Sequence, residues 1–126
     1  MDESKRVTKI AAAHDVGRVI NPKACEGQVE GGVAMGLGYA VSENFVMENG
    51  YVMSKYGTLG LLRATDMPEI EVCLLGKGTD DQPAFGAKGI GEISSIPTAP
   101  AAALAAWRAD GAFRDRLPLL ETAYRK

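Results

Sequence analysis

Aromatic residues, cysteine and histidine are scarce in this sequence of 126 residues, and charge of neither sign dominates. Phe, Trp and Tyr together make up 6% of the chain, which leaves little aromatic mass for a core. The two cysteines, Cys25 and Cys73, are far apart and form no CxxC pair, which favours a reduced, cytoplasmic protein over a disulfide-bonded one. The single histidine, His14, excludes a histidine-rich metal site.

Charge balance and hydropathy exclude two further classes of protein. Lys and Arg number 14 against 16 Asp and Glu, so the basic surplus that non-specific nucleic-acid binding requires is missing. Apolar stretches are interrupted well short of the roughly 20 residues of a membrane span. The charged residues 1–6 precede no apolar segment, so we expect no secretory signal. The length indicates one domain over residues 1–126, as part of a larger domain or alone.

Glycine, by contrast, is abundant, with 15 residues concentrated in two clusters. The first cluster falls in a long helix predicted from residue 24 to about residue 46, after a capping signal at Asn21-Pro22. This cluster comprises Gly27, Gly31, Gly32, Gly36 and Gly38. Each glycine inside a helix lowers the helix stability by about 1 kcal/mol relative to alanine. A group that packs closely against these glycines must therefore offset the loss. The approaching group is either a second helix that packs on small residues or a bound cofactor that faces Gln28.

The second glycine cluster is FGAKGIGE at residues 85–92. Consecutive backbone N–H groups in such a loop can form an anion-binding nest. The Walker phosphate loop does not match, because Lys88 is followed by Gly89, and the dinucleotide fingerprint GxGxxG is absent. Glu92 is flanked by isoleucines, and partial burial there would raise its pKa and make it a candidate general base. A glutamate that caps the following helix is the alternative interpretation.

The remaining pattern predicts an α+β chain with the element order β-α-β-β-β-loop-α. Strands are expected at residues 7–13, in a hairpin of residues 44–47 and 51–53, and at residues 69–75, where apolar and polar residues alternate. An alanine-rich helix is expected to end near Asp110-Gly111. We therefore expect two helices packed on a small mixed or antiparallel sheet.

Four segments carry a more specific signal: HDVGRVINP at residues 14–22, EGQVEGGVAMGLGYA at 26–40, ATDMPEIEV at 64–72 and FGAKGIGE at 85–92. In this order they resemble the C-terminal part of the molybdenum-binding chain of the xanthine dehydrogenase and aldehyde oxidase family, over nearly the whole sequence. The resemblance implies a place in a molybdopterin-binding domain. It also implies an oxidoreductase that hydroxylates an N-heterocycle or an aldehyde with water as the oxygen source.

The resemblance assigns roles to particular residues of this chain. Glu92 is implied to be the catalytic base, which deprotonates a hydroxyl group at the molybdenum centre. Gln28 is implied to contact the pterin cofactor. The other residues implied to bind the cofactor are Gly86, Ala87, Lys88 and Gly89, with Lys88 as an electrostatic or structural anchor.

The resemblance also implies partners, because it covers only the last part of the family's chain. A larger molybdopterin-binding chain is expected to complete the site and to share the molybdenum-molybdopterin cofactor. The sequence has neither an iron–sulfur cysteine pattern nor a flavin-binding segment, so iron–sulfur clusters and FAD are expected on partner chains. We expect the isolated chain to be inactive and to self-associate or pair with a larger chain. The alternatives are a non-catalytic binding or assembly module and a truncated remnant or expressed piece of such a subunit.

Overall fold

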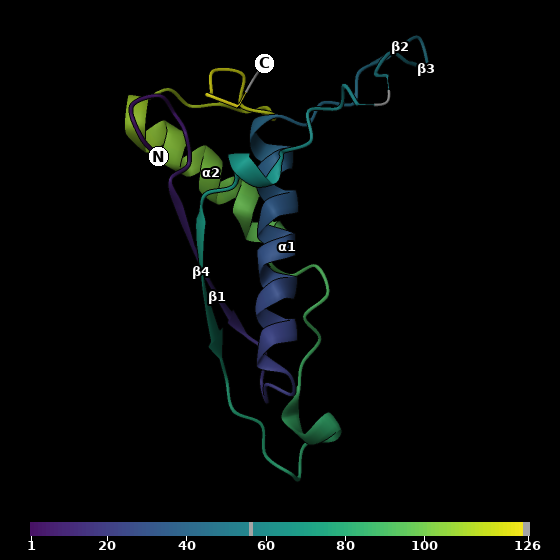
Figure 1. Cartoon of the computed structure of the whole chain (residues 1–126), viewed down its shortest axis with the longest axis vertical. Helices are drawn as coiled ribbons and strands as arrows, with labels where there is room; N and C mark the ends of the chain where they lie inside the picture. The colour runs from purple at the N-terminus through teal and green to yellow at the C-terminus, as the bar shows by residue number, and fades with distance from the viewer. Residues whose placement is uncertain (56, 125–126) are drawn as a thin grey trace.

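The computed structural model describes residues 1–55 and 57–124, which contain two helices and four strands (Figure 1). The strands are Lys9–Asp15 (β1), Met47–Glu48 (β2), Tyr51–Val52 (β3) and Glu69–Leu75 (β4). The helices are Pro22–Val41 (α1) and Ser95–Asp110 (α2), and short 3₁₀ turns span Ala64–Asp66 and Pro83–Gly86. This is the expected α+β architecture of two helices with small sheets.

Helix α1 begins where the sequence predicts. Asn21 is the N-cap, and its side-chain oxygen accepts a hydrogen bond from the backbone N–H of Ala24 at 3.1 Å. Pro22 follows in the first helical position, where its missing N–H removes no helical hydrogen bond. Helix α2 also ends as predicted, since Gly111 adopts the left-handed conformation directly after Asp110.

The C-terminal end of α1 differs from the prediction, because the helix stops at Val41 and does not continue to about residue 46. Ser42 leaves the helical conformation. The backbone N–H groups of Ser42 and Glu43 both donate to the carbonyl of Gly38, at 3.0 and 2.9 Å. These bonds satisfy a terminal carbonyl and turn the chain away from the helix axis.

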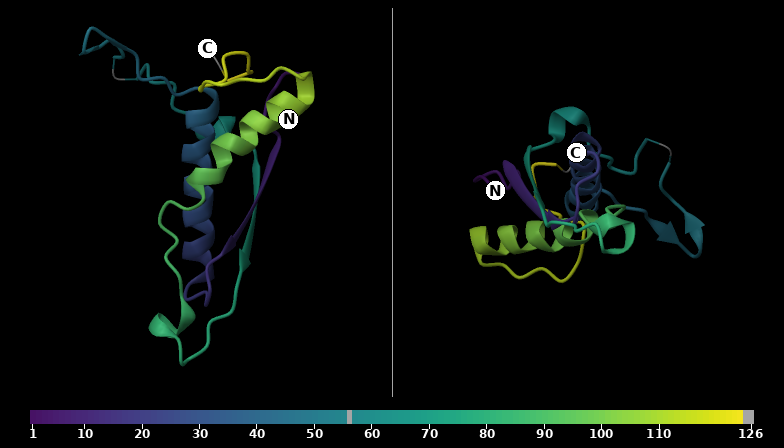
Figure 2. Two further views of the ribbon diagram at one scale, coloured as in Figure 1. Left: turned by 180° about the vertical axis from the view of Figure 1, so that it is seen from behind. Right: turned by 90° about the horizontal axis from the view of Figure 1, so that it is seen from below.

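The strands form two separate sheets of two strands each. β1 and β4 pair in parallel, whereas β2 and β3 form an antiparallel hairpin, as predicted around Asn49-Gly50. β1 extends two residues beyond the predicted residue 13, because His14 and Asp15 pair with the last two residues of β4. The sheet that lies along α1 is therefore purely parallel and not the mixed or antiparallel sheet expected, because the antiparallel hairpin stands apart from it (Figure 2).

Helix α1 lies at the centre of the core and packs on both the β1–β4 sheet and α2 (Figure 2). Toward the sheet, Val29 and Val33 are fully buried with Ala12 of β1. Toward α2, the buried residues of α1 are Leu37, Ala40 and Val41. The helix thus supplies most of the large buried side chains, which fixes its position relative to both neighbours.

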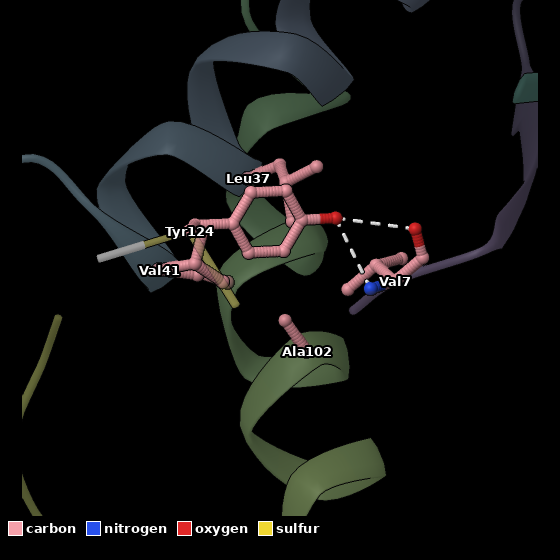
Figure 3. Packing of buried hydrophobic residues seen from close by; sticks show 7 residues of the cluster. Val7, Leu37, Val41, Ala102 and Tyr124 are labelled. Atoms are coloured by element: carbon pink, nitrogen blue, oxygen red, sulfur yellow. Dashed lines mark hydrogen bonds between the residues drawn. The ribbon is translucent and has the colours of Figure 1, made fainter. Parts of the chain in front are cut away.

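The C-terminal segment completes the core near the end of α1 (Figure 3). The Tyr124 hydroxyl accepts a hydrogen bond from the Val7 N–H and donates one to the Val7 carbonyl, both at 3.1 Å. Burial raises the pKa of Tyr124. Leu119 is buried, and its N–H donates to the Ala40 carbonyl at 2.7 Å. These contacts join the last residues of the described chain to the segment before β1 and to α1.

Two glycines of α1 allow α2 to pack directly on its backbone. A Cβ atom on Gly36 would lie 2.6 Å from the backbone oxygen of Ser95, and one on Gly32 would collide with the side chain at the N-terminus of α2. Packing of a second helix on small residues is therefore confirmed for these two positions. A Cβ atom on Gly27 or Gly31 would meet no atom of the described residues within 4 Å, so an outside group can approach there.

Substitution of these glycines tests the helix packing. We expect Gly36→Ala to lower the free energy of unfolding by about 1–3 kcal/mol, because the added methyl group overpacks the crossing of the two helices. Gly31→Ala is the matched control and should raise it by up to about 1 kcal/mol, since alanine favours the helix and meets no neighbour. Urea denaturation measures both changes. Equal effects of the two substitutions would contradict the packing described.

Candidate functional site

The two glycine-rich segments meet near the N-terminal end of α1. The side-chain amide of Gln28 donates a hydrogen bond of 2.5 Å to the backbone carbonyl of Gly91, 63 residues further along the chain. Gly91 directly precedes Glu92. The structure therefore brings the helix that carries Gln28 and the loop that carries Glu92 together.

The start of this loop is attached to the turn after β1. Gly17 pairs with Ala87 in an isolated antiparallel bridge. Two backbone hydrogen bonds of 3.0 Å flank the bridge, one from Arg18 to Gly86 and one from Lys88 to Val16. Gly17 has a φ of +62°, and a Cβ atom there would collide with the backbone oxygen of Gly86. Only glycine fits at this contact, which fixes the loop against the turn.

An ion pair reinforces the same contact. Lys88 Nζ lies 2.5 Å from Asp15 Oδ2, and the other carboxylate oxygen accepts a hydrogen bond of 3.0 Å from the backbone N–H of Gly17. The hydrogen bond from Lys88 lowers the pKa of Asp15. Lys88 is thus a structural anchor of the loop. The sequence pattern predicts no role for Asp15, although the residue lies in the HDVGRVINP segment.

A groove of about 480 Å³ opens between α1 and this loop. Its walls include Ile20, Ala24, Cys25, Gln28, Lys88 and Gly91. Arg18 also lines the groove, but its guanidinium pairs with Asp80 at 2.7 Å, as Lys88 pairs with Asp15. A Cβ atom on Gly89 or Gly91 would meet no described atom within 4 Å, so the backbone here is accessible. A ligand in the groove would therefore meet backbone groups and the Gln28 amide, because the cations of Arg18 and Lys88 are already paired.

Glu92 is exposed, in contrast to the partial burial considered from its isoleucine neighbours. Its backbone carbonyl accepts hydrogen bonds from the Ser95 hydroxyl at 2.8 Å and the Ser95 N–H at 3.1 Å. The N-cap of α2 is Ser94, so the alternative interpretation of Glu92 as a helix-capping side chain is wrong. Within residues 1–55 and 57–124, no hydrogen bond or ion pair engages the Glu92 carboxylate. That carboxylate can therefore act on a group outside this chain.

The described residues show no arrangement for metal ligation or membrane insertion. No group of three or more His, Cys, Asp or Glu side chains among the described residues is placed to hold a metal ion. No helix in this part of the chain combines the length and apolarity that a bilayer crossing requires.

Comparisons with known proteins identify the family of the chain. Residues 3–68 match the model of the molybdopterin cofactor-binding domain. The chain is 34% identical to a putative xanthine dehydrogenase molybdenum-binding subunit of Escherichia coli over 116 residues, which cover 90% of this chain and 15% of that one. It is 33% identical over 118 residues, with the same coverage, to subunit gamma of the 6-hydroxypseudooxynicotine dehydrogenase complex of Paenarthrobacter nicotinovorans.

A solved structure shows the same fold. The quinoline 2-oxidoreductase of Pseudomonas putida aligns with a TM-score of 0.78 and 28% identity, over 92% of this chain and 15% of that one. Fold, motifs and relatives together define the chain as a molybdopterin cofactor-binding domain. The chain belongs to the molybdopterin cofactor-binding domain family, which confirms the resemblance carried by the four segments. It spans about 15% of the length of the curated relatives described above.

The Asp15–Lys88 ion pair is testable by titration. Lys88→Met removes the cation that lowers the Asp15 pKa, so that pKa should rise toward its ordinary value of about 3.9. NMR titration of the Asp15 carboxyl group measures the change. Lys55→Met, which removes an exposed lysine that follows β3, is the control and should leave the Asp15 pKa unchanged.

The same shift predicts the direction of a pH effect on stability. The folded-state pKa of Asp15 lies below the unfolded one, so its contribution to stability is present above about pH 4 and is lost on acidification through the folded pKa. An Asp15 pKa that is equal in the wild-type chain and in Lys88→Met would show that the ion pair does not form in solution.

Proposed function

We propose that this chain forms part of the molybdopterin-binding portion of a molybdenum hydroxylase similar to xanthine dehydrogenase, with residues 1–126 in one domain. The enzyme would hydroxylate an N-heterocycle or an aldehyde in the cytoplasm. The observation that supports this most strongly is the hydrogen bond from Gln28 to Gly91. It holds Glu92, whose carboxylate has no partner within residues 1–55 and 57–124, beside a glutamine and an accessible glycine-rich backbone.

The groups at this site suit a flat, anionic cofactor with hydrogen-bonding edges. The start of α1 carries the positive end of the helix dipole, while its N–H groups are largely used, since Pro22 has none and Ala24 donates to Asn21. Gln28 uses one N–H on Gly91 and keeps its carbonyl oxygen and second N–H for another group. The residues that would hold the cofactor are Gln28, Gly86, Ala87, Lys88 and Gly89. A bound molybdenum-molybdopterin cofactor would supply the redox-active metal, which takes up the electrons of the substrate.

Glu92 would serve as the general base of this site. A base needs a carboxylate that is not already committed to a cation or a helix terminus. The Glu92 carboxylate meets this condition among the described residues, and its backbone is fixed on both sides, at Gly91 by Gln28 and at its own carbonyl by Ser95. Enclosure by another part of the enzyme would exclude water and strengthen the base.

Completion of the site by other polypeptide segments belongs to the same proposal. The chain spans about 15% of its curated relatives, and one of those relatives is named as a subunit of a dehydrogenase complex. A larger molybdopterin-binding chain would contribute the remaining cofactor and substrate contacts. Subunits with iron–sulfur clusters and FAD would carry the electrons away. The isolated chain would therefore be inactive.

Glu92→Gln in the assembled enzyme tests the catalytic assignment. Because glutamine has a similar shape but cannot accept the proton, turnover should fall by at least about 10²-fold, with molybdenum content close to that of the wild type. Glu3→Gln, at an exposed glutamate of the N-terminal segment, is the control and should retain activity. Full activity of Glu92→Gln would contradict the assignment of Glu92 as the general base and favour the non-catalytic binding or assembly module.

Gln28→Ala separates cofactor binding from proton transfer. The substitution removes both the bond to Gly91 and the amide proposed to face the cofactor. Molybdenum content per enzyme and turnover should therefore decrease together, whereas Glu92→Gln should lower turnover alone. Elemental analysis and activity on the same preparation give both quantities. Normal molybdenum content and activity in Gln28→Ala would contradict the role of Gln28.

A further inference from the structure

Residues 44–55 form an arm that projects from the rest of the chain, beyond the C-terminal end of α1 (Figure 1, Figure 2). We call this segment the hairpin arm. In the described part of the chain, β2 and β3 pair only with each other, through Met47 with Val52 and Glu48 with Tyr51. An isolated two-stranded hairpin is at best marginally stable in water. A second surface is therefore needed to hold the arm in this conformation.

The arm exposes an unusual amount of apolar surface. Six of its large apolar side chains are between 40% and 77% exposed, namely Phe45, Val46, Met47, Tyr51, Val52 and Met53. Glu48 is the only charged residue between positions 45 and 53. Single exposed apolar residues are ordinary, but a contiguous group marks an interaction site. Aromatic residues and methionine with little charge are typical of the centre of a protein interface.

The arm lies far from the proposed catalytic groups along α1. Gln28 is in the second turn of α1, whereas the arm follows the last turn, which ends at Val41 (Figure 1). A partner that holds the arm would therefore contact the end of α1 opposite to the candidate site. The arm can fix the chain in an assembly without occupying the groove.

We propose that the hairpin arm docks into an apolar groove of the remaining part of the molybdopterin-binding subunit. That part lies outside residues 1–126, either on the same polypeptide or on a partner chain. Tyr51 and Val52 are the central contacts, and the unpaired outer edges of β2 and β3 offer backbone groups for strand addition. This inference rests on the proposed function, because it names a molybdopterin-binding partner.

The size of the relatives and the distribution of apolar surface favour this occupant over a second copy of the chain. About 85% of each curated relative lies outside the matched segment, so most of such a subunit is available as a partner. Apolar side chains are also exposed on other faces, such as Met35 and Tyr39 on α1 and Leu104 and Trp107 on α2. A two-fold contact between arms would cover one patch, whereas a large chain can cover several.

Site-specific cross-linking in the assembled, molybdenum-containing enzyme tests this inference. Tyr51 is replaced by the photoreactive residue p-benzoylphenylalanine, and the cross-linked peptides are identified by mass spectrometry. The same replacement at Glu3, outside the arm, is the control. We expect Tyr51 to capture a peptide of the molybdopterin-binding subunit from outside residues 1–126. Capture of a second copy of residues 1–126, or no capture in an active preparation, would overturn the inference.

A substitution in the hairpin arm measures how strongly the arm contributes to the proposed contact. Tyr51→Asp places a charge at the proposed contact and should weaken the contact between residues 1–126 and the rest of the subunit by about 30-fold or more, the loss typical of a central aromatic anchor. Glu3→Asp is the matched control and should leave assembly unchanged. Unchanged assembly of Tyr51→Asp would overturn the docking proposal alone, provided that Glu92→Gln still abolishes turnover. Turnover that survives Glu92→Gln, together with cross-links from Tyr51 to the predicted subunit, would overturn the catalytic assignment alone.

Discussion

The close approach of the loop before α2 to the backbone of α1 is the contact on which the candidate site depends. Gly32 and Gly36 place no side chain of α1 between the two helices, so the N-terminus of α2 lies directly on the backbone of α1. Glu92 is three residues before Ser95, where α2 begins, and is therefore placed by the same crossing. Gln28, one turn before Gly32 on α1, then reaches the loop with its amide. The close crossing of α1 and α2 at Gly32 and Gly36 therefore determines both the helix packing and the position of the loop that carries Glu92.

The other end of the loop is held by a different device. Gly17 and Ala87 form a backbone bridge, and the ion pair between Asp15 and Lys88 closes over it. The loop is thus fixed at residues 86–88 and again at Gly91, while the backbone between these points is accessible. A loop that is rigid at its ends and uncovered in its middle suits a bulky cofactor, because the backbone is arranged before the cofactor binds.

Local signals were sufficient to predict much of the fold. The cap at Asn21, the hairpin around Asn49-Gly50 and the strand at residues 69–75 all depend on neighbouring residues, and the structure has them. The end of α1 and the burial of Tyr124 depend on contacts between distant segments, which a local pattern does not contain. The parallel pairing of β1 and β4 also joins distant segments, and alternation of apolar residues carries no strand direction.

In the candidate site, too, the sequence predicts the residues of local motifs but not the contacts between distant segments. The motifs selected Gln28 and residues 86–92, but neither the bond from Gln28 to Gly91 nor the anchoring role of Asp15 follows from spacing. The most direct measurement is the position of molybdenum in crystals of the assembled enzyme, from anomalous scattering at the molybdenum edge. The account predicts one peak beside the groove, next to the Glu92 carboxylate. A molybdenum peak remote from both Glu92 and Gln28 would contradict it.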